Sequence, residues 1–381
     1  MAAVIPLSLY VHVPWCVRKC PYCDFNSHQQ QGQLPEADYV TALLQDLRND
    51  STYIQGRSLQ SIFIGGGTPS LFSAASYERL LAGIRQIVPL AADIEITLEA
   101  NPGTFEQEKF SDYRKAGINR LSIGIQSFDA AHLHKLGRIH GREEALRAAD
   151  IAHAAGFDNF NLDLMFGLPE QSQAQALADL HIALSCQPTH LSWYQLTIEP
   201  NTEFFRRPPT LPPDDNIADM QQAGIDLLEK NGFARYEISA YSKPGKASRH
   251  NFNYWQFGDY LGIGAGAHGK LTTIASDAFE IVRTRKTRMP QHYLAAQGKF
   301  TAEAKAVAVN ELPLEFMMNA LRLTEGVDAV LYCERTGQPL AELLPTLQQL
   351  QRKHLMQSCA DRLAPTTLGL RFLNEVLLEF M

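Results

Sequence analysis

The chain has 381 residues, of which 45% are hydrophobic and 20% are charged, as expected for a globular protein with one large domain and a smaller one. Its formal net charge of −7 does not favour nucleic-acid binding. No apolar run reaches the roughly 18 residues of a membrane span, and the first residues lack the basic region of a signal peptide. We therefore expect a cytoplasmic protein, in which clustered cysteines more often bind metal or do redox chemistry than form disulfides.

Apolar, β-branched runs alternate with helical patterns through the first 200 residues. The expected strands cover residues 7–13, 61–67, 94–100, 120–128, 159–167 and 190–198. Glycines at the ends of helical patterns, as at Gly117 and Gly156, suit left-handed C-caps. This alternation predicts an α/β fold with a parallel sheet, either doubly wound or an incomplete barrel.

Small and polar residues recur on one face of three of these strands. They are Thr97 and Glu99, then Ser122, Gly124 and Gln126, then Asn161 and Asp163. Such residues could simply satisfy backbone groups at strand ends. Their agreement between strands favours a barrel with a shared site at its C-terminal mouth.

The remaining chain divides into two further segments. A proline-rich link after Thr210 leads to a helix, a strand-like ARYEISAYS, a loop with HNFNYW and the glycine-rich YLGIGAGAHGK. From about residue 300, three amphipathic helices and a short hairpin predict a mostly helical, winged-helix-like domain. We expect a core over residues 1–235, an extension over 236–299 and a C-terminal domain over 300–381.

Three cysteines lie close together directly after the first strand, as Cys16-x3-Cys20-x2-Cys23. Thiolates suit zinc or iron–sulfur clusters. Structural zinc needs four ligands, and His12 or His28 could supply the fourth. Three thiolates can instead hold a 4Fe–4S cluster through three irons, which leaves one iron open to a substrate.

Other residues point to a ligand near the cysteines. The segment GGGTPS, with Gly66, Gly67 and Thr68, follows the second strand and would let backbone groups approach a ligand, although it could be only a tight turn. Glu99 could bind a ribose hydroxyl or an ammonium group. Arg138 could pair with a carboxylate, or form an ordinary surface salt bridge.

The segment CVRKCPYC matches the CxxxCxxC signature of the radical S-adenosylmethionine (SAM) superfamily. The resemblance implies a partial (β/α)6 barrel with the cluster loop after the first strand. It also implies that the amino and carboxylate groups of SAM chelate the open iron, and that an electron from the cluster can cleave the sulfonium.

The chain also resembles the oxygen-independent coproporphyrinogen III oxidase family over nearly its full length. YVHVPWC, GGGTPS, LEANPGT, LSIGIQSF, LGRIHG and NLDLMFGLP match that family in order, as does the helical C-terminal domain. The SAM-binding positions implied by this resemblance are Tyr10, Tyr22, Gly66, Gly67, Thr68, Glu99, Gln126, Arg138 and Asp163.

Two departures favour the heme chaperone branch, the HemW-like proteins. Phe25 stands where the oxidases have a further cysteine, and only nine residues precede Tyr10, whereas the oxidases carry an N-terminal extension. The branch also has an HNxxYW motif, present here at residues 250–255. The resemblance implies heme as cargo, an acceptor protein of unknown identity, and His250 as a heme contact and candidate axial ligand. Alternatively, this motif only caps a loop and packs on the barrel.

Two weaker signals lie further along the chain. His268 could approach a ligand or be a satisfied loop histidine. The basic run RTRKTR (283–288) could meet heme propionates or be a solvated strand face. The favoured function is thus a heme chaperone with a 4Fe–4S cluster and SAM, and the alternative is a radical SAM dehydrogenase acting on coproporphyrinogen III. No catalytic residue is assigned, and an electron donor is needed only if SAM is cleaved.

Overall fold

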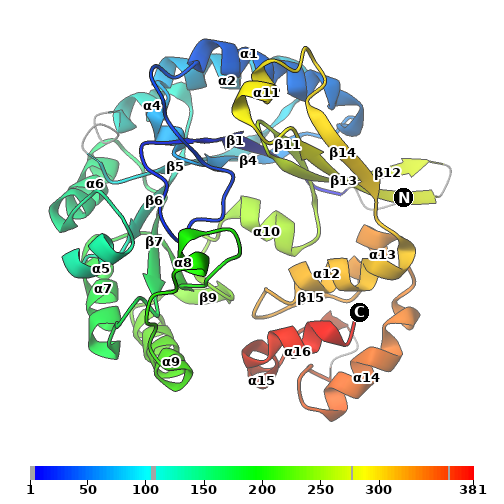
Figure 1. Ribbon diagram of the computed structural model, residues 1–381. Coiled ribbons are helices and arrows are strands. Elements are labelled where there is room, and N and C mark those ends of the chain that lie inside the picture. Colours follow the sequence, from blue (N-terminus) through cyan, green and yellow to red (C-terminus); the bar gives the residue numbers. More distant parts are fainter. Residues whose placement is uncertain (1–4, 104–108, 276–277, 359–360) are drawn as a thin grey trace.

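The computed structural model describes residues 5–103, 109–275, 278–358 and 361–381. Its centre is a curved sheet in which six strands run parallel and lie side by side in chain order (Figure 1). These strands are β1 (Leu7–Val13), β4 (Leu59–Gly66), β5 (Leu90–Ala100), β6 (Arg120–Gln126), β7 (Phe160–Phe166) and β8 (His190–Gln195). The predicted partial barrel is therefore confirmed.

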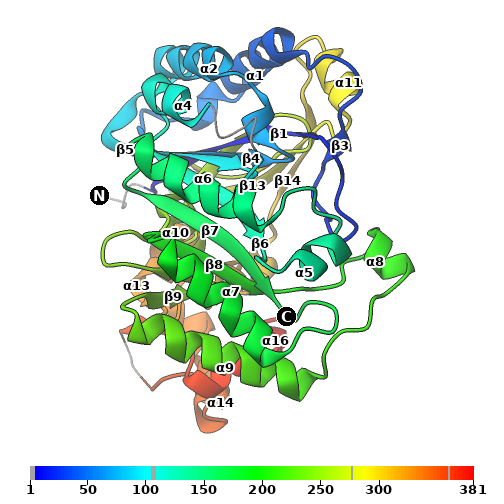
Figure 2. The same ribbon diagram turned by 90° about the vertical axis from the view of Figure 1, so that its left-hand side faces the viewer.

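Helices cover the outer face of this sheet, as Figures 1 and 2 show. They are α1 (Glu36–Asn49), α2 (Ala74–Ile87), α4 (Phe110–Ala116), α6 (Arg142–Ala154), α7 (Gln173–Ser185) and α9 (Asp214–Lys230). Gly117 ends α4 with a φ of 109°, and Gly156 follows α6 with a φ of 80°, as their C-cap positions predicted. Because both faces of the strands are covered, β1 buries six of its seven residues.

Further strands extend the sheet at both edges. β11 (Asp259–Ile263) pairs in parallel with β1, and β12 (His268–Ala275), β13 (Ala278–Lys286) and β14 (Thr301–Ala306) follow in antiparallel order. At the other edge, β10 (Ala240–Ser242) and β9 (Ala234–Glu237) are antiparallel additions to β8. A separate parallel pair, β2 (Trp15–Cys16) and β3 (His28–Gln29), brackets the cysteine segment.

The HNFNYW motif is a helix, which corrects our expectation of a loop. It forms α10 (Arg249–Trp255), which contacts β1, β4 and β11 and lies inside the ring of strands (Figure 1). The hydroxyl of Ser248 caps its N-terminus by accepting from the Asn251 backbone N–H at 3.4 Å. The run is too short to show a helical period, so the sequence pattern alone did not reveal it.

The C-terminal part is mostly helical, as predicted. It contains α12 (Leu312–Ala320), α13 (Val330–Thr336), α14 (Leu344–Arg352), α15 (Thr367–Arg371), α16 (Leu373–Leu378) and the strand pair β15 (Val327–Asp328) and β16 (Arg362–Leu363). Its core, centred on Phe316 and Tyr332, also takes in Phe257 and Ile281 of the preceding segment. The sequence pattern did not predict α13, which is followed by Gly337 as its C-cap.

The described residues also form the short α-helices α5 (Ala130–Lys135), α8 (Glu203–Arg206) and α11 (Pro290–Leu294). Within the described ranges, no helix has the length and apolar character needed to cross a membrane.

Candidate functional site

A hollow with about 1290 Å³ of empty space lies at the C-terminal ends of the parallel strands. We call it the cluster hollow because Cys16, Cys20 and Cys23 all line it. Eight of the nine predicted SAM-binding residues line it too: Tyr22, Gly66, Gly67, Thr68, Glu99, Gln126, Arg138 and Asp163. The fold thus brings together residues that are up to about 150 positions apart in the sequence, as a barrel mouth does.

The glycine segment holds the start of the cysteine loop in place. The Thr68 N–H donates to the Trp15 carbonyl at 2.7 Å, and the Gly67 N–H donates to the Val13 carbonyl at 2.8 Å. A Cβ on Gly67 would lie 2.5 Å from the Trp15 carbonyl oxygen, so only glycine permits this approach. The GGGTPS segment therefore positions the cysteine loop as well as lining the hollow.

The chemistry of the donor set fits an iron–sulfur cluster. Burial raises the pKa of the Cys16 thiol, and the nearby Cys23 and Cys20 raise it further. The thiolates of this loop would therefore repel one another. Positive iron would relieve this mutual repulsion by binding the thiolates.

The two histidines that could supply a fourth zinc ligand, His12 and His28, are hydrogen-bonded within the protein. Both ring nitrogens of His12 are engaged, Nδ1 with the Tyr10 hydroxyl at 3.0 Å and Nε2 with the Asn26 carbonyl at 2.9 Å. His28 contacts the Asn26 side chain at 3.1 Å. The geometry therefore favours three thiolates on a cluster over one zinc ion.

Two buried carboxyl groups face the cluster hollow. Burial, and secondly the charge of Asp163, raise the pKa of Glu99 to about 8, although Glu99 accepts from the Gly66 N–H at 3.0 Å. Burial also raises the pKa of Asp163, which accepts from Ser122 at 2.9 Å and from Asn161 at 2.8 Å. Two carboxyls that resist ionisation in this way would gain most from a positively charged ligand.

Gln126 adopts a strained backbone at the end of β6. Its φ is +69°, a region that residues other than glycine rarely adopt, and its side chain is buried. The Tyr194 hydroxyl donates to its Oε1 at 2.9 Å. Local strain of this kind is concentrated at binding sites, which agrees with the ligand role predicted for Gln126.

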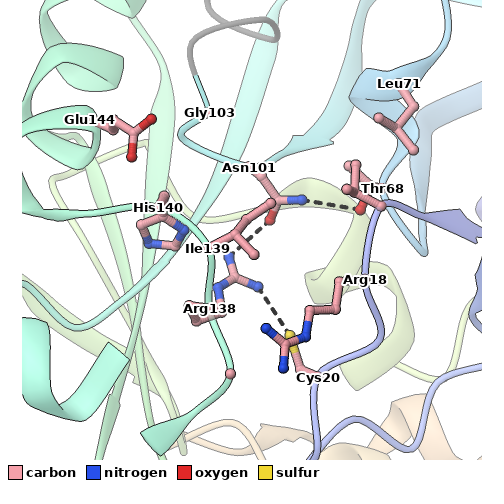
Figure 3. A pocket seen from close by; sticks show the side chains of 12 residues that line it. Arg18, Cys20, Thr68, Leu71, Asn101, Gly103, Arg138, Ile139, His140 and Glu144 are labelled. Atoms are coloured by element: carbon pink, nitrogen blue, oxygen red, sulfur yellow. Dashed lines mark hydrogen bonds between the residues drawn. The ribbon is translucent and has the colours of Figure 1, made fainter. Parts of the chain in front are cut away.

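Arg138 lies beside the cysteine loop and not on the open surface. Figure 3 shows its guanidinium between Cys20 and Asn101; it donates to Cys20 Sγ at 3.8 Å and to Asn101 Oδ1 at 2.8 Å. Asn101 in turn donates to Thr68 Oγ1 at 3.0 Å. Arg138 also donates to the Gly124 carbonyl. Arg138 thus places a positive charge next to Cys20 in the cysteine loop.

Two predicted ligand contacts lie elsewhere. Tyr10 lines a neighbouring hollow and not the cluster hollow. His250 is 1% exposed, and both of its ring nitrogens are hydrogen-bonded, Nδ1 to Ser61 Oγ at 3.0 Å and Nε2 to the Tyr254 hydroxyl at 2.7 Å. Burial lowers the pKa of His250 to about 3, so the ring is neutral. Direct ligation of iron by His250 would therefore require one of these hydrogen bonds to break.

Sequence reasoning missed several residues that line the cluster hollow. They include Asn101, Tyr194, Glu237, Asn251, Trp255 and Arg322. The LEANPGT and HNFNYW segments had drawn attention to Asn101 and to the pair Asn251 and Trp255, but not to this location. The others lie on β8, on β9 and in the turn after α12, and their positions depend on the tertiary fold.

Comparison with known proteins identifies the family. Residues 10–182 match the radical SAM superfamily, and residues 307–372 match the HemN C-terminal domain. The chain is 51% identical to the heme chaperone HemW of Escherichia coli, with all of both chains covered. It is 50% identical to the heme chaperone HemW of Haemophilus influenzae, with 100% of this chain and 99% of that protein covered.

The chain belongs to the HemW family. A HemW from Bacillus subtilis is 35% identical, with 98% of this chain and 99% of that protein covered, so the relationship spans distant bacteria. The solved coproporphyrinogen III oxidase (HemN) from Escherichia coli has the same fold, with a TM-score of 0.82 and 22% identity over 99% of this chain and 90% of that chain. This member of the HemW family therefore has a HemN-like fold and carries Cys16, Cys20 and Cys23 at the mouth of its barrel.

Proposed function

We propose that this protein is a heme chaperone that binds heme and transfers it to an acceptor protein, and that it carries a 4Fe–4S cluster and SAM. The observation that carries the proposal is its full-length identity of 51% to a protein named heme chaperone HemW. The cluster hollow supports it, because the three thiols and eight predicted SAM-binding residues converge there. The acceptor protein is not identified by these features.

The residues of the cluster hollow have distinct tasks in this proposal. Cys16, Cys20 and Cys23 would hold three irons, and the cluster would supply one-electron reduction beside its open iron. Arg138 keeps Cys20 in a positive environment. Glu99 and Asp163 would face the sulfonium cation of SAM, and their ionisation would become favourable when this cation binds.

His250, expected from the sequence to contact heme, has an indirect part in this proposal because it is buried and both of its ring nitrogens are hydrogen-bonded. It lies on α10, the helix that also places Asn251 and Trp255 on the wall of the cluster hollow. Through its bond to Tyr254, His250 fixes the orientation of a second side chain of the HNxxYW motif. A role in positioning these neighbours agrees with its burial better than a role as an exposed ligand.

The alternative function is a radical SAM dehydrogenase acting on coproporphyrinogen III. The observation in its favour is the likeness of the whole fold to HemN, at a TM-score of 0.82. Against it stands Phe25, which is 60% exposed at the position of the oxidases' further cysteine. An electron donor would be required for this activity, and also for any SAM cleavage by the chaperone.

Location and domain limits belong to the same proposal. We place the protein in the cytoplasm, where a reduced cluster and free thiols persist more easily than in oxidising compartments.

The proposed domain limits are residues 1–235, 236–299 and 300–381. The match to the HemN C-terminal domain supports them, because it falls within the last segment.

The two functions are separated by assaying one anaerobically reconstituted preparation in two ways. Heme titration should give a saturable absorption change with about one heme per chain. Incubation with coproporphyrinogen III, SAM and a reductant should give no protoporphyrinogen beyond a protein-free control. Catalytic formation of protoporphyrinogen would replace the chaperone with the enzyme.

A further inference from the structure

A second hollow, with about 1060 Å³ of empty space, opens beside the cluster hollow. Its lining residues are Tyr10, His12, Asp24, Phe25, Asn26, Tyr254, Tyr260, Gly266, His268, Arg285, Lys286 and Arg288. Phe25 lines both hollows, and its side chain is 60% exposed. Such an exposed aromatic ring at a shared rim is suited to cover a flat apolar ligand.

The charged groups of this second hollow are mostly basic. Arg285 and Arg288 are exposed, whereas Lys286 is buried against Asp46 and Asp50 and is already neutralised. Arg285 pairs with Glu303 at 2.9 Å, but both side chains are 51% exposed, so this pair is weak and can be exchanged for another carboxylate. Asp24 is the acidic residue of the lining. The surplus positive charge favours a ligand with carboxylate groups.

His268 differs from the other histidine of the lining. It is exposed at the start of β12, directly opposite Arg285 of β13. Partial burial, followed by the charges of Arg285 and Arg283, lowers the pKa of His268, so the imidazole is neutral near pH 7 and can bind a metal. His12, in contrast, has both ring nitrogens hydrogen-bonded within the protein.

The HNxxYW helix supplies an inner wall of the second hollow. The rings of Tyr254 and Tyr260 lie 4.3 Å apart between centroids, and the Tyr254 hydroxyl contacts His250 Nε2 at 2.7 Å. His250 also stacks on Phe63 with ring centroids 5.2 Å apart. His250 therefore fixes the position of Tyr254 from within the core, on the side away from the ligand.

We propose that heme docks in this second hollow, with its iron toward His268, its propionates toward Arg285 and Arg288, and its macrocycle against Phe25. This inference rests on the proposed function and adds the location of the heme. It makes His250 a positioning residue that acts through Tyr254. It also explains the replacement of the oxidases' cysteine by Phe25, because this ring lies between the heme and the cluster hollow.

The test is an anaerobic heme titration of the reconstituted wild type and matched variants. His268→Ala is compared with His181→Ala, an exposed histidine on the outer helix α7. The double variant Arg285→Ala/Arg288→Ala is compared with Arg147→Ala on α6. Asn251→Ala probes the cluster hollow. Cluster absorbance, measured in every sample, should match the wild type, which shows that each variant has folded.

We expect His268→Ala to shift the heme absorption band, because the axial ligand changes. The double arginine variant should keep the band but bind heme about ten-fold or more weakly, the loss expected for one or two charge-assisted hydrogen bonds. Heme dimethyl ester, which lacks free propionates, should bind the wild type and the double arginine variant equally. The two control variants should match the wild type.

Two outcomes would overturn the assignment in different ways. If His268→Ala and the double arginine variant bind heme as the wild type does, and Asn251→Ala loses it, the heme lies in the cluster hollow and the chaperone function stands. If the wild type itself binds no heme, the proposed function fails and the docking site fails with it.

Discussion

At the scale of single residues, the three cysteines carry the clearest prediction. Each of Cys16→Ala, Cys20→Ala and Cys23→Ala should abolish the broad visible absorbance of the reconstituted cluster and lower the iron and sulfide content, because two thiolates cannot hold the cluster firmly. Cys186→Ala is the matched control, since Cys186 lies at the end of α7 and lines neither hollow. Retention of full cluster content in a Cys20→Ala protein would rule out this assignment.

Glu99 gives a prediction about pH. Its folded-state pKa of about 8 is above the unfolded value, so its favourable effect on folding is present at acid pH and is lost as pH rises through about 8. A cationic ligand needs the ionised form, so SAM affinity should fall as pH drops below about 8. Glu99→Gln should flatten this dependence and weaken binding by about 1.5–3 kcal/mol at high pH.

Isothermal titration of the wild type and Glu99→Gln across pH 6.5 to 9 would check this. The ionisation of SAM itself is common to both proteins, so the difference between the two curves isolates Glu99. Parallel curves would show that Glu99 does not contact the ligand.

The sequence could predict the place of some site residues but not of others. Cys16, Cys20 and Cys23 are recognisable because they are neighbours in one loop, and Glu99, Gln126 and Asp163 because strand alternation places them on one face. Tyr194 and Arg322 became visible only in the fold, since β8 and the C-terminal part reach the cluster hollow through tertiary packing. His250 was recognised by its motif, but its burial depends on Ser61 and Tyr254.

At the scale of elements, a buried ion cluster joins the extension to the barrel. Lys286 at the end of β13 contacts Asp46 at 2.6 Å and Asp50 at 2.7 Å, both on or next to α1. Removing one partner leaves buried charges uncompensated, so Lys286→Met should destabilise the protein by about 3–5 kcal/mol near neutral pH. The loss should shrink at lower pH, because burial raises the pKa of both carboxyls and lets them take up protons.

Chemical denaturation of Lys286→Met, at pH 8 and at pH 5, tests this. The matched control is Lys305→Met on β14, because Lys305 is exposed and its loss should change stability by less than about 0.5 kcal/mol. Equal stability of Lys286→Met and Lys305→Met would show that the cluster does not anchor β13.

The strand pattern of the barrel was predictable because alternating β-branched runs and amphipathic helices leave strong periodic signals. The helix α10 was not, since seven residues with several polar side chains show no clear period and depend on the Ser248 cap and on packing against β4. The separation of the C-terminal helices α15 and α16 at Phe372 likewise follows local backbone geometry and not hydrophobic pattern.

At the scale of the whole molecule, two hollows share one exposed ring. The cluster hollow contains the cysteines and the acidic ligand residues, and the second hollow contains basic and aromatic side chains with His268. The fold is that of HemN, and the exposed ring of Phe25 lies at the boundary between the two hollows. A heme chaperone must bind heme and release it chemically unchanged, whereas an oxidase converts its tetrapyrrole to a product.

The most direct measurement follows the tetrapyrrole through the protein. Reconstituted protein is loaded with one equivalent of heme, freed of excess, supplied with SAM and a reductant, and mixed with an apo-hemoprotein as acceptor. Mass spectrometry and absorption should find about one equivalent of chemically unchanged heme in the acceptor. Recovery of a modified tetrapyrrole, or multiple turnovers of coproporphyrinogen III by the same preparation, would contradict the chaperone account.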